Sequence, residues 1–412
     1  MTRRVVITGM AGLSPIGQDW KHVRDALQSG RSGVARVPEW EDIEDLETKL
    51  GARVADFATP ESWPRKKTRT MGRVSLMAAR AAELALEDAG LRDHAVIASG
   101  RAGVSYGSSS GSPPAIAVYA RRLFIERTLR GIGANDYLQI MSHTCASNIA
   151  NLIGTRGRIV PTCTACTSGS QGIGFGYEAI KFGQQDVMLT GGAEELHEMD
   201  AAVFDILFSA TTRNDEPTRT PRPFDAARDG LVVGEGAGCL VLEALEHARS
   251  RGARIRAEVL GYGTNCDGRH MTNPHPDTMQ EAMRLALADA GVGADEIGYV
   301  NAHGTATVIG DIAESSATFA VFGGRVPFSS LKGHLGHTLG ACGALEAWMS
   351  LEMIGEGWVA PTLNLDDLDP RCAPLDYVRG EPRALRTDCI MSNNFAFGGI
   401  NTSLLFRRWA GD

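Results

Sequence analysis

The stretch Arg158-Ile159-Val160-Pro161-Thr162-Cys163-Thr164-Ala165-Cys166-Thr167-Ser168-Gly169 passes from a short apolar run into a series of small residues. Residues 168–182 have helical composition, with a serine at the start and Gly183 as the stop. Residues 187–190 then form another short apolar run. This succession predicts a strand, a helix and a second strand, which is the repeating unit of layered α/β folds.

The same alternation extends in both directions along the chain. Short runs rich in apolar and β-branched residues predict further strands, and apolar residues at helical spacing predict further helices. The strands are expected at residues 5–8, 102–106, 239–242, 255–262, 298–302, 326–329, 390–392 and 402–406, and the helices at 75–89 and 278–290. Since the cycle begins again after residue 242, we expect two related halves, residues 1–250 and 251–412. The polar stretch 209–230, which contains three prolines, is interpreted as an ordered loop and not a linker.

The composition is that of a globular protein, because 43% of the 412 residues are hydrophobic and 22% are charged. A formal net charge of -8 argues against a general binder of nucleic acids or anionic membranes, so an acidic partner would have to meet a local basic patch. No apolar run approaches the length of a membrane span, and residues 1–12 are interpreted as a strand and its turn, not a signal peptide. Eight scattered cysteines predict reduced thiols in the cytoplasm.

Cys166 stands where the predicted strand gives way to the helix. Free N-H groups and the positive end of the helix dipole stabilise a thiolate at such a place, so we expect its pKa to fall from about 8.5 toward neutrality. The alternatives are a buried structural cysteine and a metal or redox site formed with Cys163 through the C-x-x-C spacing. Because the chain has no second C-x-x-C, the metal and redox interpretation is disfavoured.

Two histidines follow predicted strands in glycine-containing turns. His303 lies in the stretch Asn301-Ala302-His303-Gly304-Thr305, and His337 lies in Lys332-Gly333-His334-Leu335-Gly336-His337. A side chain at the carboxyl end of a strand faces a crevice in α/β folds. Each histidine alone is compatible with a bystander role, but both turns together with a candidate nucleophile predict one shared site. The His334-x-x-His337 spacing also suits a metal, yet the glutamate of H-E-x-x-H is absent.

Two glycine-rich segments invite ligand-binding interpretations. In Phe397-Gly398-Gly399 the turn either aims an N-H group at a developing oxyanion or is a β-bulge. Residues 234–238, Gly-Glu-Gly-Ala-Gly, are not followed by Gly-Lys-Ser/Thr, and the chain has no complete G-x-G-x-x-G. The sequence therefore argues against a nucleotide-binding loop.

These segments, in this order, resemble the elongating β-ketoacyl-[acyl carrier protein] synthases, and the synthase II branch in particular. The resemblance runs essentially end to end and includes residues 4–9, Thr164-Ala165-Cys166-Thr167-Ser168 and Phe397-Gly398-Gly399. It implies that Cys166 carries the acyl group and that His303 and His337 act on the malonyl group. It further implies an ion pair of Lys332 with Glu314, pantetheine contacts for Thr305 and Thr307, and a gate at Phe397 beside an oxyanion hole formed by the N-H groups of Cys166 and Phe397.

The resemblance implies the thiolase fold, in which two related five-stranded halves form a five-layer α/β/α/β/α sandwich. It implies decarboxylative condensation of an acyl-cysteine with malonyl-ACP, without a metal or organic cofactor. The expected partners are an acyl carrier protein, whose phosphopantetheine bears the acyl and malonyl groups, and a second subunit that completes the acyl pocket near Ser110. That subunit is either identical or similar to a chain-length factor. The basic residues Arg65, Lys66, Lys67 and Arg69 are expected to dock the acidic carrier.

Several residues depart from the family pattern. The chain has Asn394-Phe395-Ala396-Phe397-Gly398-Gly399-Ile400-Asn401 where members commonly carry Ser-Phe-Gly-Phe-Gly-Gly-Thr-Asn, and Cys163, Cys342 and His334 are unusual. Residues 107–111, Gly-Ser-Ser-Ser-Gly, replace the bulky aliphatic gate of the housekeeping enzyme, which is more similar to the synthases of aryl polyene clusters. The alternative function is a noncatalytic partner subunit of the chain-length-factor type, although such partners typically lack the nucleophile.

Overall fold

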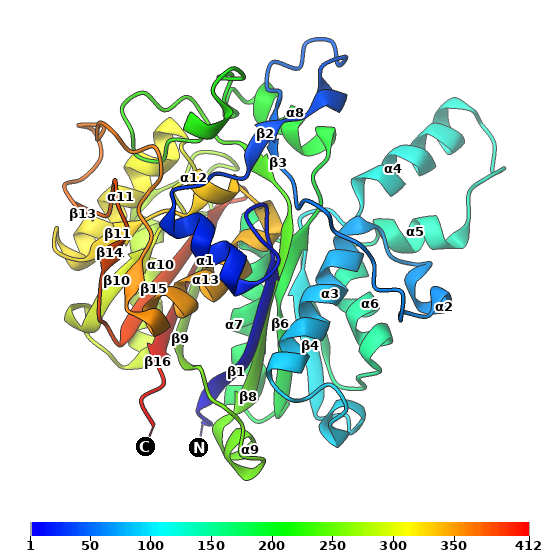
Figure 1. The fold of residues 1–412 in the computed structure, drawn as a ribbon, viewed down its shortest axis with the longest axis horizontal. Coiled ribbons are helices and arrows are strands. Elements are labelled where there is room, and N and C mark those ends of the chain that lie inside the picture. The colour runs from blue at the N-terminus through cyan, green and yellow to red at the C-terminus, as the bar shows by residue number, and fades with distance from the viewer. Residues whose placement is uncertain (1, 412) are drawn as a thin grey trace.

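Two sets of five strands, one from each half of the chain, form the centre of the computed structural model, which describes residues 2–411 (Figure 1). The first set lies in the order β5-β4-β6-β8-β1 and the second in the order β11-β10-β15-β16-β9. β1 and β9 pair with each other and so join the two sets edge to edge. The bounds of the first set are β1 (Val5–Leu13), β4 (Ala102–Gly107), β5 (Ile159–Thr162), β6 (Val187–Glu194) and β8 (Gly236–Ala244), and those of the second are β9 (Ala257–Cys266), β10 (Ile297–Asn301), β11 (Pro327–Ser329), β15 (Cys389–Ala396) and β16 (Ile400–Arg408).

Both sets have the same topology. Numbered along the chain within each set, the strands lie in the order 3-2-4-5-1. Strands 2, 3 and 4 of each set are parallel, and strand 5 runs antiparallel to both of its neighbours. A short strand, β13 (Asp376–Tyr377), extends the outer edge of the second set. The second half therefore repeats the architecture of the first, in keeping with the restart of the sequence pattern.

Helices cover the strands in three layers. α3 (Arg73–Asp88) and α6 (Thr144–Ile153) pack on the outer face of the first set, and α10 (Pro276–Ala290) covers the second with α11 (Val308–Phe322) beside it. Between the two sets lie α7 (Ser168–Lys181) and α13 (Cys342–Glu356), which contact strands of both. Apolar cores fill the spaces between these layers. The result is the predicted five-layer α/β/α/β/α order.

The central helix α7 carries glycines where it meets the two sets of strands. A Cβ on Gly172 would come within 2.5 Å of the carbonyl oxygen of Gly191 in β6, and a Cβ on Gly174 within 2.4 Å of the ring of Tyr262 in β9. Glycines at these positions let the helix lie directly against a strand of each set. This close packing fixes the start of α7, where Cys166 lies.

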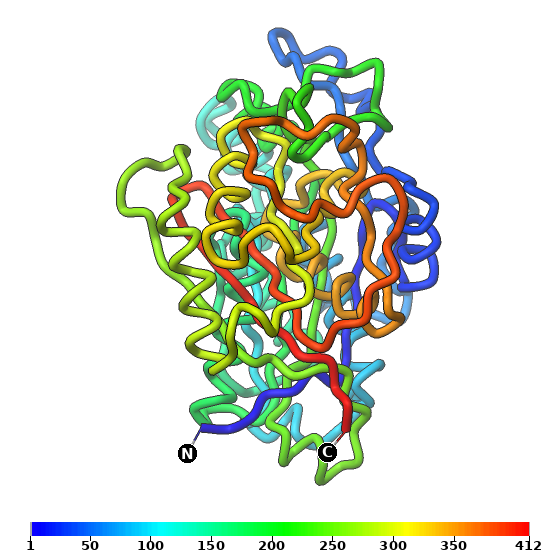
Figure 2. Tube along the Cα trace, turned by 90° about the vertical axis from the view of Figure 1, so that its left-hand side faces the viewer, coloured from blue at the N-terminus to red at the C-terminus, as the bar shows by residue number. Residues whose placement is uncertain are grey.

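Smaller elements surround this body. In Figure 1, α4 and α5 project from it as an arm, and in Figure 2 the loop between β9 and α10 projects from another side. The bounds are α1 (Trp20–Gln28), α2 (Arg65–Thr68), α4 (Pro113–Ala120), α5 (Ala134–Ile140), α8 (Glu198–Ile206), α9 (Leu245–Ser250), α12 (Lys332–Leu335), β2 (Val34–Arg36), β3 (Leu50–Ala52), β7 (Val233–Gly234), β12 (Trp358–Val359) and β14 (Arg383–Ala384). Within residues 2–411, no helix is both long and apolar enough to cross a membrane.

The expected strands are present, but most extend beyond the apolar runs that predicted them. β1, for example, continues to Leu13, because its pairing with β8 passes through Gly9 and Gly12. A Cβ on Gly9 would lie 2.2 Å from the carbonyl oxygen of Ala85 in α3, so this glycine admits a helix and does not end the strand. The stretch 209–230 is an ordered loop, as predicted, since Phe224 and Asp225 within it are fully buried.

Candidate active site

Cys166 lies in the short turn between β5 and α7. The 3-10 turn Ala165–Thr167 leads directly into α7, and Ala165 has a left-handed φ of 49°, a conformation that favours glycine. Ser168 holds the turn, because its Oγ accepts from the Thr164 N-H at 3.0 Å and donates to the Ala165 carbonyl at 2.7 Å. The strained backbone therefore fixes the Cys166 thiol, whose residue is 5% exposed, at the start of the central helix.

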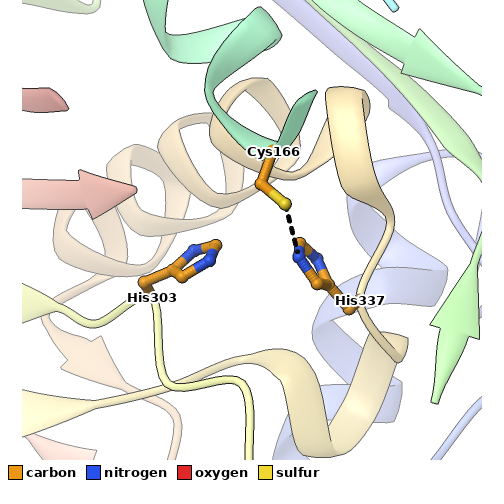
Figure 3. A group of neighbouring side chains, drawn as sticks. All are labelled: Cys166, His303 and His337. Carbon is orange, nitrogen blue, oxygen red and sulfur yellow. Dashed lines mark hydrogen bonds between the residues drawn. The ribbon is translucent and has the colours of Figure 1, made fainter. Parts of the chain in front are cut away.

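The three residues predicted to share a site meet, although they come from distant segments. His303 follows β10, and His337 follows α12. The two imidazole rings are nearly perpendicular, with their centroids 5.1 Å apart. His337 Nε2 lies 3.0 Å from Cys166 Sγ, and His303 faces the same space (Figure 3). The structure thus brings a thiol and two imidazoles together in a buried group.

The hydrogen-bond partners assign the ring proton of both histidines to Nε2. His337 Nδ1 accepts a hydrogen bond from the Leu339 N-H at 3.3 Å, and His303 Nδ1 lies 3.3 Å from the ammonium group of Lys332, which can only donate. Burial, and also the nearby charge of Lys332, lowers the pKa of both imidazoles well below the usual value. At neutral pH the rings are therefore neutral, and each Nε2-H is a hydrogen-bond donor.

The expected fall in the Cys166 pKa is wrong. Burial raises the pKa of this thiol to about 12, and it outweighs the lowering by Lys332 and by the N-H groups of Phe397 and Cys166. The helix start alone favours the thiolate, but the removal of water from around the sulfur disfavours it more strongly. The two N-H groups that lower this pKa are the pair predicted to form the oxyanion hole.

The ion pair of Lys332 is formed with Glu346, and the predicted pairing with Glu314 is wrong. Lys332 Nζ lies 2.6 Å from Glu346 Oε1, and both side chains are 1% exposed. Glu314 instead accepts the N-H groups of His303 and Gly304, at 2.7 and 2.6 Å. Glu346 therefore balances the charge beside the His303 ring, while Glu314 holds the backbone of the His303 turn.

Glu346 and Asn394 belong to the site but were not predicted as site residues. Asn394 Nδ2 donates to the second carboxylate oxygen of Glu346 at 2.7 Å and lies 3.4 Å from His303 Nδ1. Glu346 stands in a largely apolar stretch of α13. A lone carboxylate in such a helix signals a buried partner, because an unpaired buried charge is costly. The structure identifies this partner as Lys332.

A cavity of about 720 Å³, its mouth included, connects the surface with Cys166. Thr305 and Thr307 line it, with their Oγ1 atoms 2.9 Å apart. Phe397 also lines it, and its ring packs against Phe204 with centroids 5.2 Å apart. These residues are placed where a substrate arm would pass. Ser110 is not among the residues that line this cavity, and its contact with an acyl group stays a prediction.

Residues 2–248 match the family described as Beta-ketoacyl synthase, N-terminal domain, and residues 256–366 match Beta-ketoacyl synthase, C-terminal domain. The chain belongs to the β-ketoacyl synthase family. A curated relative, 3-oxoacyl-[acyl-carrier-protein] synthase 2 of Vibrio cholerae serotype O1, is 37% identical, and the alignment covers 98% of this chain and 99% of the relative. The predicted family is therefore confirmed.

Solved structures of other ketosynthases have the same fold. A beta-ketoacyl synthase from Burkholderia phymatum STM815 is 57% identical with a TM-score of 0.97, over 99% of this chain and 100% of that one. The ishigamide ketosynthase/chain length factor is 33% identical with a TM-score of 0.92, over 100% of both chains. The prediction of the thiolase fold is confirmed.

In this β-ketoacyl synthase, Cys166, His303 and His337 also form a group whose ligand atoms lie within 4.8 Å of one another, as in a metal site. The 3.0 Å between Cys166 Sγ and His337 Nε2 is shorter than the separation of about 3.5 Å that tetrahedral zinc imposes on a sulfur and a nitrogen ligand. The ammonium group of Lys332 beside His303 also disfavours a second cation. Cys163 lies apart from this group, and its Sγ donates to the Ser109 carbonyl at 3.0 Å. The geometry fits a hydrogen-bonded thiol better than a metal centre.

The predicted docking residues lie on and directly after α2, but Lys67 is engaged within the chain. Lys67 Nζ donates to the carbonyls of Asn151 and Leu152 at the end of α6, at 2.7 and 2.9 Å. In Figure 1, α2 and α11 lie at opposite ends of the long axis, and the first turn of α11 lines the cavity. The α2 residues of this chain are thus remote from the mouth of its own cavity, and their docking role stays a prediction.

Proposed function

We propose that this β-ketoacyl synthase condenses an acyl thioester with a malonyl thioester, both carried by an acyl carrier protein. The observation that carries the proposal is the Cys166 thiol, 3.0 Å from His337 Nε2 and faced by His303, at the inner end of a cavity. A noncatalytic partner subunit would need no such group. The complete set of a nucleophile and two donors therefore argues against the chain-length-factor alternative.

The first step transfers the acyl group to Cys166. The thiolate attacks the thioester carbonyl, the carbon-sulfur bond to pantetheine breaks, and the pantetheine sulfur leaves and takes up the proton lost by the thiol. The N-H groups of Cys166 and Phe397 lower the pKa of the Cys166 thiol, so we assign them to the place where the tetrahedral oxyanion forms. Since burial raises the Cys166 pKa to about 12, these donors must stabilise a thiolate that is a minor species.

The second step uses the two histidines. Loss of carbon dioxide from the malonyl thioester leaves an enolate, and the Nε2-H groups of His303 and His337 donate to its oxygen. The enolate carbon attacks the acyl carbonyl on Cys166, a carbon-carbon bond forms, and the Cys166 thiolate leaves and regains a proton. Neutral rings protonated on Nε2 are suited to donation and not to proton removal.

We assign a different part of this chemistry to each half of the chain. The half formed by residues 1–250 carries Cys166, and the half formed by residues 251–412 carries His303, His337 and Lys332. Lys332 acts on His303 through Nδ1, and its ion pair with Glu346 keeps the ammonium group in place. The active site is therefore assembled between the two halves.

Incubation of the purified protein with octanoyl-ACP and malonyl-ACP labelled with carbon-13 in the carboxyl group tests the proposed reaction. One labelled carbon dioxide for each 3-oxodecanoyl-ACP is expected. Omission of octanoyl-ACP is the control for uncoupled decarboxylation. Acyl hydrolysis without a carbon-carbon bond, or no reaction of any acyl donor, would contradict the proposal.

The partners are inferred from the cavity and from the relatives. The phosphopantetheine arm of the carrier would lie along Thr305 and Thr307, and a second subunit, identical or similar to a chain-length factor, would cover the region of Ser110. The name of the Vibrio relative includes an acyl carrier protein, and the ishigamide structure pairs a ketosynthase with a chain length factor, which supports both inferences. Sedimentation of the protein alone and with a co-expressed partner distinguishes a homodimer from a heterodimer.

The basic residues around α2 are the proposed electrostatic part of carrier docking. Arg65 and Lys66 suit a test better than Lys67, whose ammonium group caps α6. Arg65→Glu with Lys66→Glu is expected to raise the apparent KM for acyl-ACP mainly at low salt, because salt screens exposed charges. An equal loss with a small pantetheine thioester would mean that the change damages the site or the fold.

We infer further that the acyl group is polar or conjugated, as in the aryl polyene pathway. Among residues 2–411, Asp200 lies one turn before Phe204 on α8 and therefore on the same face, beside the cavity. Five side-chain atoms of this region are buried without a hydrogen-bond partner in the described part of the chain: Ser109 Oγ, Ser110 Oγ, Thr164 Oγ1, Glu194 Oε1 and Asp200 Oδ2. Buried polar atoms need partners, and a hydroxylated acyl group would supply them.

Loading of Cys166 from matched acyl donors tests this finer proposal. Intact-protein mass spectrometry is expected to show faster loading from a 4-hydroxycinnamoyl donor than from cinnamoyl or octanoyl donors. Ser110→Phe is expected to shorten the longest acyl group that loads. Equal loading of all three donors would contradict the polar pocket, and an unchanged length profile would show that Ser110 does not bound it.

A further inference from the structure

Exposed apolar side chains gather at the mouth of the cavity that leads to Cys166. We call them the collar: Ile206, Phe208, Met271, Val308 and Ile309, which are 75, 94, 69, 40 and 56% exposed. Met271 and Ile309 line the cavity, and so does Ser209, the neighbour of Phe208. The collar comes from three segments, namely the end of α8, the loop after β9 and the first turn of α11. Apolar side chains gathered in this way on a surface indicate a contact site.

Phe208 combines an exposed ring with a strained, left-handed backbone. α8 ends in a Schellman motif, in which the Phe208 N-H donates to the Asp205 carbonyl and the Ser209 N-H to the Phe204 carbonyl, both at 2.8 Å. Phe208 occupies the left-handed position of this motif, with a φ of 52°, where glycine is usual. A ring that is 94% exposed returns little packing energy to the fold. Its use must therefore lie in a contact outside the chain.

The other segments of the collar are also held in place. The carbonyl of Met271 accepts a hydrogen bond from the Gly398 N-H at 2.7 Å. The buried guanidinium of Arg228 donates to the carbonyl of Val308 at 3.0 Å, which fixes the first turn of α11. The collar is therefore a pre-formed surface, and binding to it requires little ordering.

We propose that the collar is the docking surface for the acyl carrier protein, which it contacts through apolar side chains around the base of the pantetheine arm. This inference rests on the proposed function and adds the chemistry of the contact. The arm must pass through the mouth to reach Cys166, so the protein that carries the arm must rest on the residues at the mouth. A second copy of this chain seated there would close the mouth, which excludes a permanent subunit as the occupant.

An apolar contact and a basic patch respond differently to salt. Attraction between exposed charges is screened over about 10 Å at 0.1 M salt, whereas apolar contacts are not weakened by screening. The basic residues of α2 lie at the other end of the molecule from α11 (Figure 1). Of these two surfaces of one chain, only the collar is therefore placed to contact a carrier above the mouth.

Phe208→Gly separates docking from folding. Glycine relieves the left-handed strain, so the Tm is expected to rise, while the apparent KM for octanoyl-ACP rises about 10-fold and that for octanoyl-pantetheine stays unchanged. Ile206→Ser is expected to act in the same direction. Phe182→Ser is the matched control, because Phe182 is 63% exposed at the end of α7 and does not line the cavity. All variants are assayed at low salt and at about 0.5 M salt.

An increase in KM for octanoyl-ACP that is equal at both salt concentrations supports the proposal. The proposal is overturned by an increase that disappears at high salt, by an equal increase with octanoyl-pantetheine, or by an equal increase in Phe182→Ser. Sedimentation of Phe208→Gly as a monomer where the wild type is a dimer would assign the collar to a second copy instead. If the wild type accepts no acyl group from either the carrier or the pantetheine form of the donor, the proposed function fails and not the collar.

Discussion

The turns that begin α7 and α13 are built alike but are used differently. Each comes after the third strand of its half, and each is a 3-10 turn whose first residue is left-handed. These residues are Ala165, with a φ of 49°, and Leu339, with a φ of 46°. Counted from them, Cys166 corresponds to Gly340. The repeated topology therefore provides two equivalent helix starts, of which one carries the thiol.

The difference lies in what occupies the free N-H groups of each turn. The Gly340 N-H donates to the Glu194 carboxylate at 3.0 Å, and a Cβ on Gly340 would lie only 2.9 Å from the same carboxylate. The N-H of Cys166 instead lowers the pKa of its own thiol. One helix start is thus filled by a side chain of the protein, whereas the donors of the other are available to a substrate. The fold therefore sets the position of each helix start, and the neighbouring side chains determine whether its N-H groups can bind a substrate.

The largest effect on activity is expected from removing the Cys166 thiol, which is the side chain that distinguishes the two turns. Cys166→Ala should abolish acyl loading, because Cys163 is turned to the Ser109 carbonyl and Cys342 is buried behind the turn. Malonyl decarboxylation should survive, since both histidines remain. Intact-protein mass spectrometry and carbon dioxide release measure the two reactions, and acyl loading of the variant would contradict this account.

The histidine turns of the second half are expected to control only the second step. His303→Ala and His337→Ala should each slow decarboxylation by about 10² to 10⁴, the range for a positioned proton donor, while Cys166 still accepts an acyl group. Release of carbon-13 carbon dioxide and single-turnover acylation separate the two effects. Undiminished release in either variant would remove that histidine from the mechanism.

Glu346→Gln tests the ion pair that lies between the two turns. The change leaves the buried ammonium group of Lys332 without its counter-charge, and breaking a buried pair costs about 3 to 5 kcal/mol. Thermal unfolding should show a large fall in Tm. Glu352→Gln is the matched control on the same helix, because Glu352 lies 3.5 Å from Arg256 in a more exposed pair. An equal fall in Tm in the two variants would mean that the Lys332–Glu346 pair contributes no more to stability than the more exposed Arg256–Glu352 pair.

Gly340→Ala sharpens the comparison of the two turns directly. The added Cβ would press on Glu194 Oε2 and the Ser109 N-H, each 2.9 Å away, so we expect a loss of about 1 to 3 kcal/mol. Gly355→Ala, within α13 itself and with open space around it, should stabilise the protein by about 0.5 to 1 kcal/mol. Denaturant unfolding of both variants measures the contrast. A neutral Gly340→Ala would show that Glu194 does not close this helix start.

The smallest expected effect is the pH dependence of Cys166 alkylation. Because burial raises the thiol pKa to about 12, the thiolate fraction grows with pH throughout the neutral and mildly alkaline range. Alkylation by iodoacetamide should therefore accelerate between about pH 7 and 10 without a plateau. Cys166→Ala provides the background from the other thiols. A plateau by about pH 8 would restore the lowered pKa that the helix start alone predicts.

The sequence allowed the strands, the repeat of the two halves and the meeting of Cys166, His303 and His337 to be predicted, because each rests on a local pattern. Cys166 stands at a strand-to-helix turn, and His303 and His337 stand in glycine turns after strands. The pKa of Cys166 and the partner of Lys332 could not be predicted in the same way. Both depend on burial and pairing, which arise only when segments distant in sequence meet.

The contrast between the two helix starts could not be predicted from the sequence either. Gly340 and Cys166 share no motif, and their equivalence appears only when the two strand sets are compared. Phe208 likewise could not be singled out beforehand, because nothing in the sequence marks a phenylalanine as left-handed. A glycine there would have indicated the left-handed residue after a helix. That a phenylalanine takes this position is recognised only when the backbone conformation is known.

The most direct test of the central claim is peptide mapping of the wild-type protein after incubation with an acyl-ACP. The account predicts one acyl group on the peptide that contains Cys166, attached to that sulfur and not to Cys163, and none on Cys342. Addition of malonyl-ACP should discharge this group as a 3-oxoacyl product with release of carbon dioxide. An acyl group on Cys163, or an adduct on Cys166 that malonyl-ACP does not discharge, would contradict the account.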